Sequence, residues 1–226
     1  MKNNYIISLG GSLIAPDEID VNFLRSFHQA LLRASLRNRF LIIPGGGGTA
    51  RHYQKVAKEL GKVSNDDLDW IGIAANILHS NFLRAIFGKY AHPEIVELNS
   101  KLQNIKKSIA IARGGLKPGG TSDSTAVKFA EKFGVKTIIN LTNVAGVYDR
   151  DPRKFKNAKL IPRMTWVQLK SQFGNGRIPG RHMPFDSSAA ALAKKLKLKV
   201  AIIDGSNLKN FENFLSGKNF NGTVIQ

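Results

Sequence analysis

The sequence predicts an α/β protein, a three-layer α/β/α sandwich with a largely parallel central sheet. Short runs rich in Ile and Val, typical of strands buried on both faces, occur at 5–9, 40–43, 108–112, 135–141 and 199–203. Helical patterns separate most of these runs, and such alternation is typical of this fold class. The 226 residues contain no repeat or linker, so we expect a single domain over 1–226.

Three helices are predicted in detail. The first follows Asp20, a candidate N-cap, and places Phe23, Leu24, Phe27, Leu31 and Leu32 on one face. The second covers 51–60 and ends at Gly61. The third follows Thr121 or Ser122 as N-cap and carries apolar residues at Ala126, Val127, Phe129, Ala130 and Phe133. Trp70 and Phe82 fall in another helical region, where we expect them in the core.

Composition limits the classes of function. Without cysteine the chain forms no disulfide, thiolate nucleophile or zinc-thiolate site. The apolar run near the N-terminus is too short for a signal peptide or a membrane span, so we expect a cytoplasmic protein that does not enter membranes.

The charge favours anionic partners. The 34 Lys and Arg against 16 Asp and Glu give a formal net charge of +18, which phosphates, acidic polymers or an anionic membrane would each complement. The basic residues are spread along the chain, with clusters at 101–107, 150–159 and 194–199. A nucleic-acid binder concentrates them in a stripe, so a solvated surface explains the clusters better and nucleic acid is the less favoured partner.

Glycine-rich loops follow three of the predicted strands. The first reads Ser8-Leu9-Gly10-Gly11-Ser12, the second runs from Gly45 to Arg51, and the third runs from Gly114 to Asp123. Glycine lets a phosphate approach backbone N–H groups, and the following helix adds its positive end. Each assignment to phosphate binding has an alternative. The first loop is explained equally well as a tight turn, and Arg51 as a surface arginine. Asp123, taken alone, is explained by its favourable place in the first turn of a helix. None has the Walker or dinucleotide-binding pattern.

In order along the chain, six motifs resemble the amino-acid kinase superfamily, most closely its archaeal-type UMP kinases. They are the first loop, the second loop as GGGxxAR, the segment 69–73 as DxxGI, 118–123 as PGxTTD, 143–152 as NVDGVYxxDP and 185–190 as FDxxAA. The resemblance implies ATP-dependent phosphorylation of UMP to UDP, with ATP and Mg²⁺ as cofactors and a hexameric assembly. It also implies an acceptor lobe over about 1–107 and an ATP lobe over about 108–226.

The same resemblance assigns site residues by matching positions. It implies catalytic roles for Asp123 and Asp186. Lys117 is added as a catalytic candidate because lysines of the family pattern are missing, and no metal-binding residue is assigned. UMP would contact Gly46, Gly47, Arg51, Asp69, Gly72 and Thr121, and ATP would contact Gly10, Gly11, Ser12, Asn143, Tyr148, Asp151 and Pro152.

Four positions depart from the family pattern. Ser8 and Gly48 stand where relatives carry a lysine, Ile77 replaces an arginine, and Ala145 replaces an aspartate. Lys117, Arg113 or Arg181 are candidates for the missing cation. Two further hypotheses follow: a nucleotide-binding homologue with weakened catalysis, and a kinase of the same fold acting on another phosphorylated or carboxylated metabolite.

Overall fold

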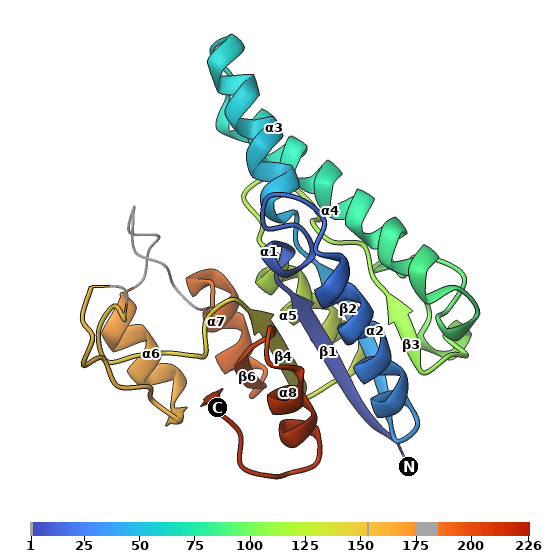
Figure 1. Cartoon of the computed structure of the whole chain (residues 1–226), viewed down its shortest axis with the longest axis vertical. Helices are drawn as coiled ribbons and strands as arrows, with labels where there is room; N and C mark the ends of the chain where they lie inside the picture. Colours follow the sequence, from blue (N-terminus) through green and yellow to red (C-terminus); the bar gives the residue numbers. More distant parts are fainter. Residues whose placement is uncertain (1, 153, 175–184) are drawn as a thin grey trace.

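In the computed structural model, described at residues 2–152, 154–174 and 185–226, the strands form one continuous sheet. The described residues form seven strands in the order β3-β2-β1-β4-β6-β7-β5, and every neighbouring pair is parallel except β6 with β7. Their bounds are β1 Asn3–Leu9, β2 Asn38–Pro44, β3 Ile109–Ile111, β4 Thr137–Thr142, β5 Arg163–Met164, β6 Lys199–Asp204 and β7 Gly222–Ile225. The largely parallel sheet is therefore confirmed (Figure 1).

Helices cover both faces of the sheet. One buried core joins the sheet to α5 (Ser122–Phe133), α6 (Trp166–Phe173) and α7 (Ser187–Lys195). The other joins it to α1 (Gly11–Ile14), α2 (Val21–Ser35), α4 (Asn65–Phe87) and α8 (Leu208–Leu215). Successive strand residues point to opposite faces, so Ile6 belongs to the first core and Ile7 to the second. The three-layer sandwich is thus confirmed.

Each of the five predicted strands forms, with ends shifted by one to a few residues. The sheet runs without a break through both halves of the chain, and β3, just after residue 107, pairs with β2. The sequence did not indicate β5 and β7, which have two and four residues. Strands this short carry too few residues for a periodic pattern.

Local capping fixes two helix starts as predicted. The Asp20 carboxylate accepts a hydrogen bond from Phe23 N at 2.8 Å. Thr121 is the N-cap of α5 and forms a capping box with Ser124. The prediction was wrong for α3, which spans Gly47–Leu60 and so begins four residues before Arg51. Gly47 and Gly48 belong to its first turn, because contacts with the preceding loops hold these glycines in place.

The long helix α4 was predicted only in outline, and it packs along α3 (Figure 1). Trp70 on α4 is 51% exposed, so its predicted place in the core was wrong, whereas Phe82 is partly buried against the core. Trp70 lies near the start of α4, in its second turn. Among the described helices, none has the length and apolar character needed to cross a membrane.

Candidate functional site

The glycine loops after β1 and β2 lie against each other at the carboxyl edge of the sheet. Gly10 N donates to Leu141 O of β4 at 2.8 Å, and Gly45 N donates to Leu9 O at 2.9 Å. A Cβ on Gly11 would lie 2.1 Å from Gly47 N. Only glycine permits this contact, and the two loops therefore form one backbone surface, as their positions after neighbouring strands predicted.

The segment 12–20, which we call the strap, lies over the start of α3. Gly48 N donates to Ala15 O at 2.7 Å, and a Cβ on Gly48 would lie 2.2 Å from Pro16 O. The Arg51 guanidinium donates to Ser12 Oγ at 3.1 Å and to Pro16 O at 3.0 Å. The strap therefore occupies the space that a side chain at position 48 would need.

The third glycine loop completes this edge. A Cβ on Gly114 would meet Pro44 O, at the end of β2, at 2.4 Å. Gly119 N donates to Asp69 Oδ2 at 2.7 Å, which ties the loop to α4. In this structure the Asp69 carboxylate, which was assigned to UMP, thus accepts a hydrogen bond from the protein backbone. Lys117 is exposed on the same loop, and within the described residues its ammonium has no ion-pair partner.

A partly buried carboxylate, Asp123, lies where β1, β4, α5 and α7 meet. Its Oδ1 accepts from Ser8 Oγ at 3.1 Å and from Asn140 Nδ2 at 3.3 Å, and its Oδ2 accepts from Asp186 N at 3.2 Å. Burial raises the pKa of Asp123 from 3.8 to about 6, and the nearby Asp186 charge adds to the rise. The hydrogen bonds from Asp186 N and Ser8 oppose it.

No Lys or Arg side chain pairs with Asp123 in the part of the chain that the structure describes. Ser8, which the family resemblance matches to a lysine, donates a hydroxyl hydrogen bond to this carboxylate. Arg113, a candidate for the missing cation, lies 3.7 Å from Glu97, and Arg181 falls outside the described residues. Of the two candidates that the structure describes, Lys117 is the one without an ion-pair partner.

The helices α3, α5 and α7 all begin at this edge. Gly46 precedes α3, Thr121 caps α5, and Asp186 caps α7, its Oδ1 accepting from Ala189 N at 2.9 Å. The N-terminus of a helix carries partial positive charge and free N–H groups. Together with the glycine backbone, these helix starts suit an anion such as a phosphate.

The residues assigned to ATP fall on two segments. Gly10, Gly11 and Ser12 follow β1, and the others lie in the connection 143–162 between β4 and β5. This connection is held by a bond from Val147 N to Thr223 Oγ1 at 2.8 Å and by one from Ile161 N to Val147 O at 2.8 Å. Along it Asn143 is exposed, Tyr148 and Asp151 are half-buried, and Pro152 is exposed. Their roles stay predictions.

Like Arg51 and Asp69, two further residues assigned to UMP have structural partners. A Cβ on Gly72 would lie 3.2 Å from Gln54 Nε2, so this glycine allows close packing between α4 and α3. The Thr121 hydroxyl accepts from Ser124 N at 3.0 Å as the cap of α5. These contacts explain both residue types, and contact with a ligand stays a prediction for each.

Sequence reasoning missed one functional candidate, His79. Its ring contacts Gly45 and Thr49, on both sides of the second glycine loop, from the buried face of α4. The ring is deeply buried, with His79 1% exposed. The signal was present in its position, because His79 lies two residues after Ile77, which replaces an arginine of the family pattern.

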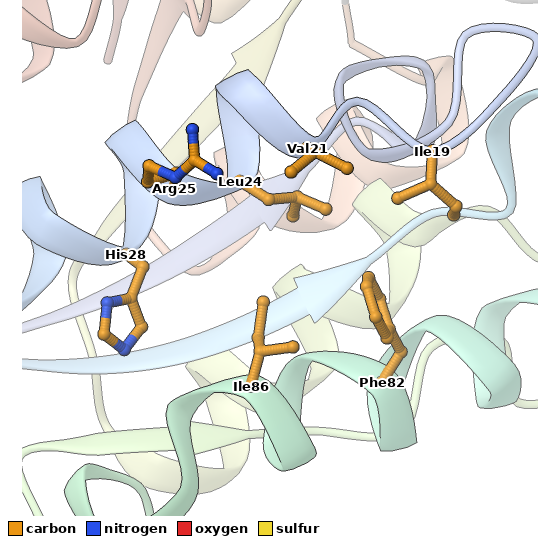
Figure 2. A pocket seen from close by; sticks show the side chains of 7 residues that line it. All are labelled: Ile19, Val21, Leu24, Arg25, His28, Phe82 and Ile86. Carbon is orange, nitrogen blue, oxygen red and sulfur yellow. The ribbon is translucent and has the colours of Figure 1, made fainter.

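A separate apolar groove lies away from the glycine loops. Figure 2 shows it between α2 and α4, lined by Ile19, Val21, Leu24, Arg25, His28, Phe82 and Ile86. Val21 is 58% exposed there, although it is apolar. With only Arg25 and His28 as polar side chains, the groove does not resemble a phosphate site.

Known proteins match this chain over nearly its whole length. The model of the amino acid kinase family matches residues 4–204. A uridylate kinase from Thermoplasma volcanium is 34% identical, covering 96% of this chain and 95% of the relative. One from Thermoplasma acidophilum is also 34% identical, covering 100% and 97%. The crystal structure of uridylate kinase from Archaeoglobus fulgidus superposes with a TM-score of 0.84 at 31% identity, covering 100% of both chains.

Proposed function

The chain belongs to the amino acid kinase family, and on that premise we propose that it is a nucleoside-monophosphate kinase that uses ATP to convert UMP to UDP. The observation that carries the proposal is the full-length similarity to uridylate kinases, at 34% identity and with both glycine loops included. The architecture supports it, because the loops after β1 and β2 and the starts of α3, α5 and α7 meet at one edge.

In the proposed reaction a UMP phosphate oxygen attacks the γ-phosphorus of ATP. The new P–O bond forms as the bond to the β-phosphate oxygen breaks, and ADP leaves. Such transfers are accelerated mainly by in-line positioning and charge neutralisation, so the protein needs no covalent nucleophile. Glycine N–H groups would hold the phosphates, and Arg51 would close on the acceptor phosphate as a bidentate donor.

Asp123 and Asp186 fit a magnesium requirement. Mg²⁺ prefers oxygen ligands and takes one or two carboxylates together with waters and nucleotide phosphates. The two residues adjoin through the bond from Asp186 N to Asp123 Oδ2, and among the described residues no cluster of three metal-binding side chains occurs. Bound with ATP, the ion would neutralise charge on the β- and γ-phosphates. The magnesium requirement and a cytoplasmic location stay predictions.

A second candidate function is nucleotide binding with slow transfer. It is favoured by Ser8, which gives Asp123 a hydroxyl where bacterial relatives have a lysine. Removing one well-aimed stabilising group lowers kcat by about a hundred- to a thousandfold. Lys117 is proposed to supply the positive charge that the lysine provides in those relatives.

Turnover and binding assays distinguish the two candidate functions. Purified protein with Mg-ATP is expected to release ADP and form UDP when UMP is added, with CMP, AMP and GMP as competing acceptors. Phosphorus NMR identifies the product. Absence of turnover with every monophosphate contradicts the kinase proposal. Calorimetric binding of UMP and ATP without turnover then supports the second candidate function, nucleotide binding with slow transfer.

Replacing Arg51 by Ala is expected to raise KM for UMP about ten- to a hundredfold, because a charge-assisted contact to phosphate is lost. KM for ATP should change little. Lys55→Ala is the matched control, since Lys55 lies one turn further along α3 and pairs only with exposed Glu59 at 3.8 Å. An unchanged KM for UMP in the Arg51 variant would remove Arg51 from the acceptor site.

The assembly is proposed as a homo-oligomer, a hexamer by resemblance. The groove between α2 and α4 and the half-exposed Trp70 provide apolar surface that a second copy would bury. Light scattering measures the mass in solution. Val21→Asp is expected to lower that mass if the groove belongs to the interface, whereas Lys55→Asp on α3 should leave it unchanged.

A further inference from the structure

The His79 side chain, on α4, contacts the second glycine loop at two points. Its Nδ1 lies 2.7 Å from Gly45 O, and its Nε2 lies 3.1 Å from Thr49 Oγ1. Gly45 follows β2 directly, and Thr49 lies in the first turn of α3, two residues before Arg51. One ring therefore joins both ends of the loop to α4.

The partners of His79 define its hydrogen-bonding state. A carbonyl oxygen only accepts, so Nδ1 carries the proton and donates to Gly45 O. The unprotonated Nε2 then accepts from the Thr49 hydroxyl. Burial lowers the pKa of His79, which favours this neutral ring, although the bond to Gly45 opposes the shift.

The bond to Gly45 O also orients the next N–H group. The described peptide bonds are all trans, and in a trans peptide the C=O and the following N–H point in opposite directions. Because Gly45 O points to His79, Gly46 N–H points away from α4. Within the described residues Gly46 N–H has no protein acceptor, whereas Gly48 N–H donates to Ala15 O.

We propose that His79 is a positioning residue for the acceptor phosphate, an inference that rests on the proposed function. It holds the Gly45–Gly46 peptide so that Gly46 N–H faces the phosphate, and through Thr49 it sets the turn of α3 that carries Arg51. The hydrogen bonds of His79 go to Gly45 and Thr49, and among the described residues none joins it to Asp123 or to the connection 143–162. We therefore expect UMP binding to depend on His79 more than ATP binding does.

The test compares three variants by UMP affinity, KM and melting temperature. His79→Ala loses both contacts, and it is expected to raise KM and Kd for UMP at least about tenfold while KM for ATP stays within about twofold. His79→Asn retains an amide N–H at the place of Nδ1, and it should restore most of the UMP affinity. Thr49→Val removes only the hydroxyl and should have an intermediate effect.

Leu83→Val is the control for a purely structural role. Leu83 is buried one turn further along α4, so its truncation lowers the melting temperature without touching the loop. UMP affinity in His79→Ala equal to wild type, or equal losses for UMP and ATP, would overturn the inference. A folded His79→Asn variant that does not restore UMP binding would also overturn the inference.

The outcomes also separate this inference from the proposed function. If the wild type binds UMP without turnover, the kinase proposal fails, and weaker UMP binding by His79→Ala with recovery in His79→Asn still supports the positioning role. If the wild type does not bind UMP in calorimetry, both proposals are overturned.

Discussion

Replacement of Asp123 by Asn is expected to lower kcat about a hundred- to a thousandfold while the protein stays folded. The carboxylate lies where β1 and β4 end and α5 and α7 begin, and it accepts bonds from Ser8, Asn140 and Asp186 N. Asn has the same shape but no charge, so it cannot organise magnesium or a lysine near the phosphates. The measurement is steady-state turnover of UMP at saturating ATP, with circular dichroism to verify folding.

The wild-type pH profile gives a second readout of Asp123. Since burial raises its pKa to about 6 in the ligand-free protein, the carboxylate gains a proton as the pH falls through that value, and kcat/KM for UMP should fall with it. Stability should change in the opposite direction. The folded state binds this proton more tightly than the unfolded chain, so the contribution of Asp123 to the free energy of unfolding rises as the pH falls from about 6 toward 3.8.

Asp204→Asn is the matched control for both readouts. Asp204 ends β6 beside β4, and its carboxylate accepts bonds only from Ser206 among the described residues. The control should keep the wild-type kcat and the decrease in activity near pH 6, whereas Asp123→Asn should lose that decrease. A pH profile that is the same in wild type and Asp123→Asn would show that another group titrates.

The sequence predicted the features that follow from local patterns. Buried strands require apolar runs, and Asp20 and Thr121 begin helices because their side chains satisfy free N–H groups. The position of the glycine loops at one edge followed from parallel strand order, because the carboxyl ends of neighbouring parallel strands meet there. These inferences needed no knowledge of distant contacts.

The sequence could not predict features that depend on distant contacts. His79 meets Gly45 across 34 positions, and no periodicity indicates which ring faces which carbonyl. The bonds of Asp123 to Ser8 and to Asp186 N connect residues separated by 115 and 63 positions. The start of α3 was misplaced because glycine has low helix propensity, and only the contacts with Gly11 and the strap hold Gly47 and Gly48 in the first turn.

Replacement of Gly48 by Ala is expected to destabilise the protein by about 1–3 kcal/mol, because even one methyl group overlaps the strap backbone. Its Cβ would lie 2.2 Å from Pro16 O and 2.8 Å from Ala15 O, and backbone atoms cannot turn aside as a flexible side chain can. Relief requires movement of the strap, which also carries the Arg51 contacts. Chemical unfolding measures the loss, and KM for UMP should rise with it.

Gly61→Ala is the control at the other end of α3, where a Cβ would meet nothing within 4 Å. It should leave stability and KM for UMP nearly unchanged, and equal effects of the two substitutions would contradict the proposed overlap with the strap.

The overlap between position 48 and the strap also explains why no lysine stands there. Gly48→Lys should lose stability as Gly48→Ala does, without a gain in kcat, because the strap already fills the space that the side chain needs. Glycine at 48 and the position of Pro16 therefore depend on each other, and a cation for the transferring phosphate has to come from another loop, with Lys117 the proposed source.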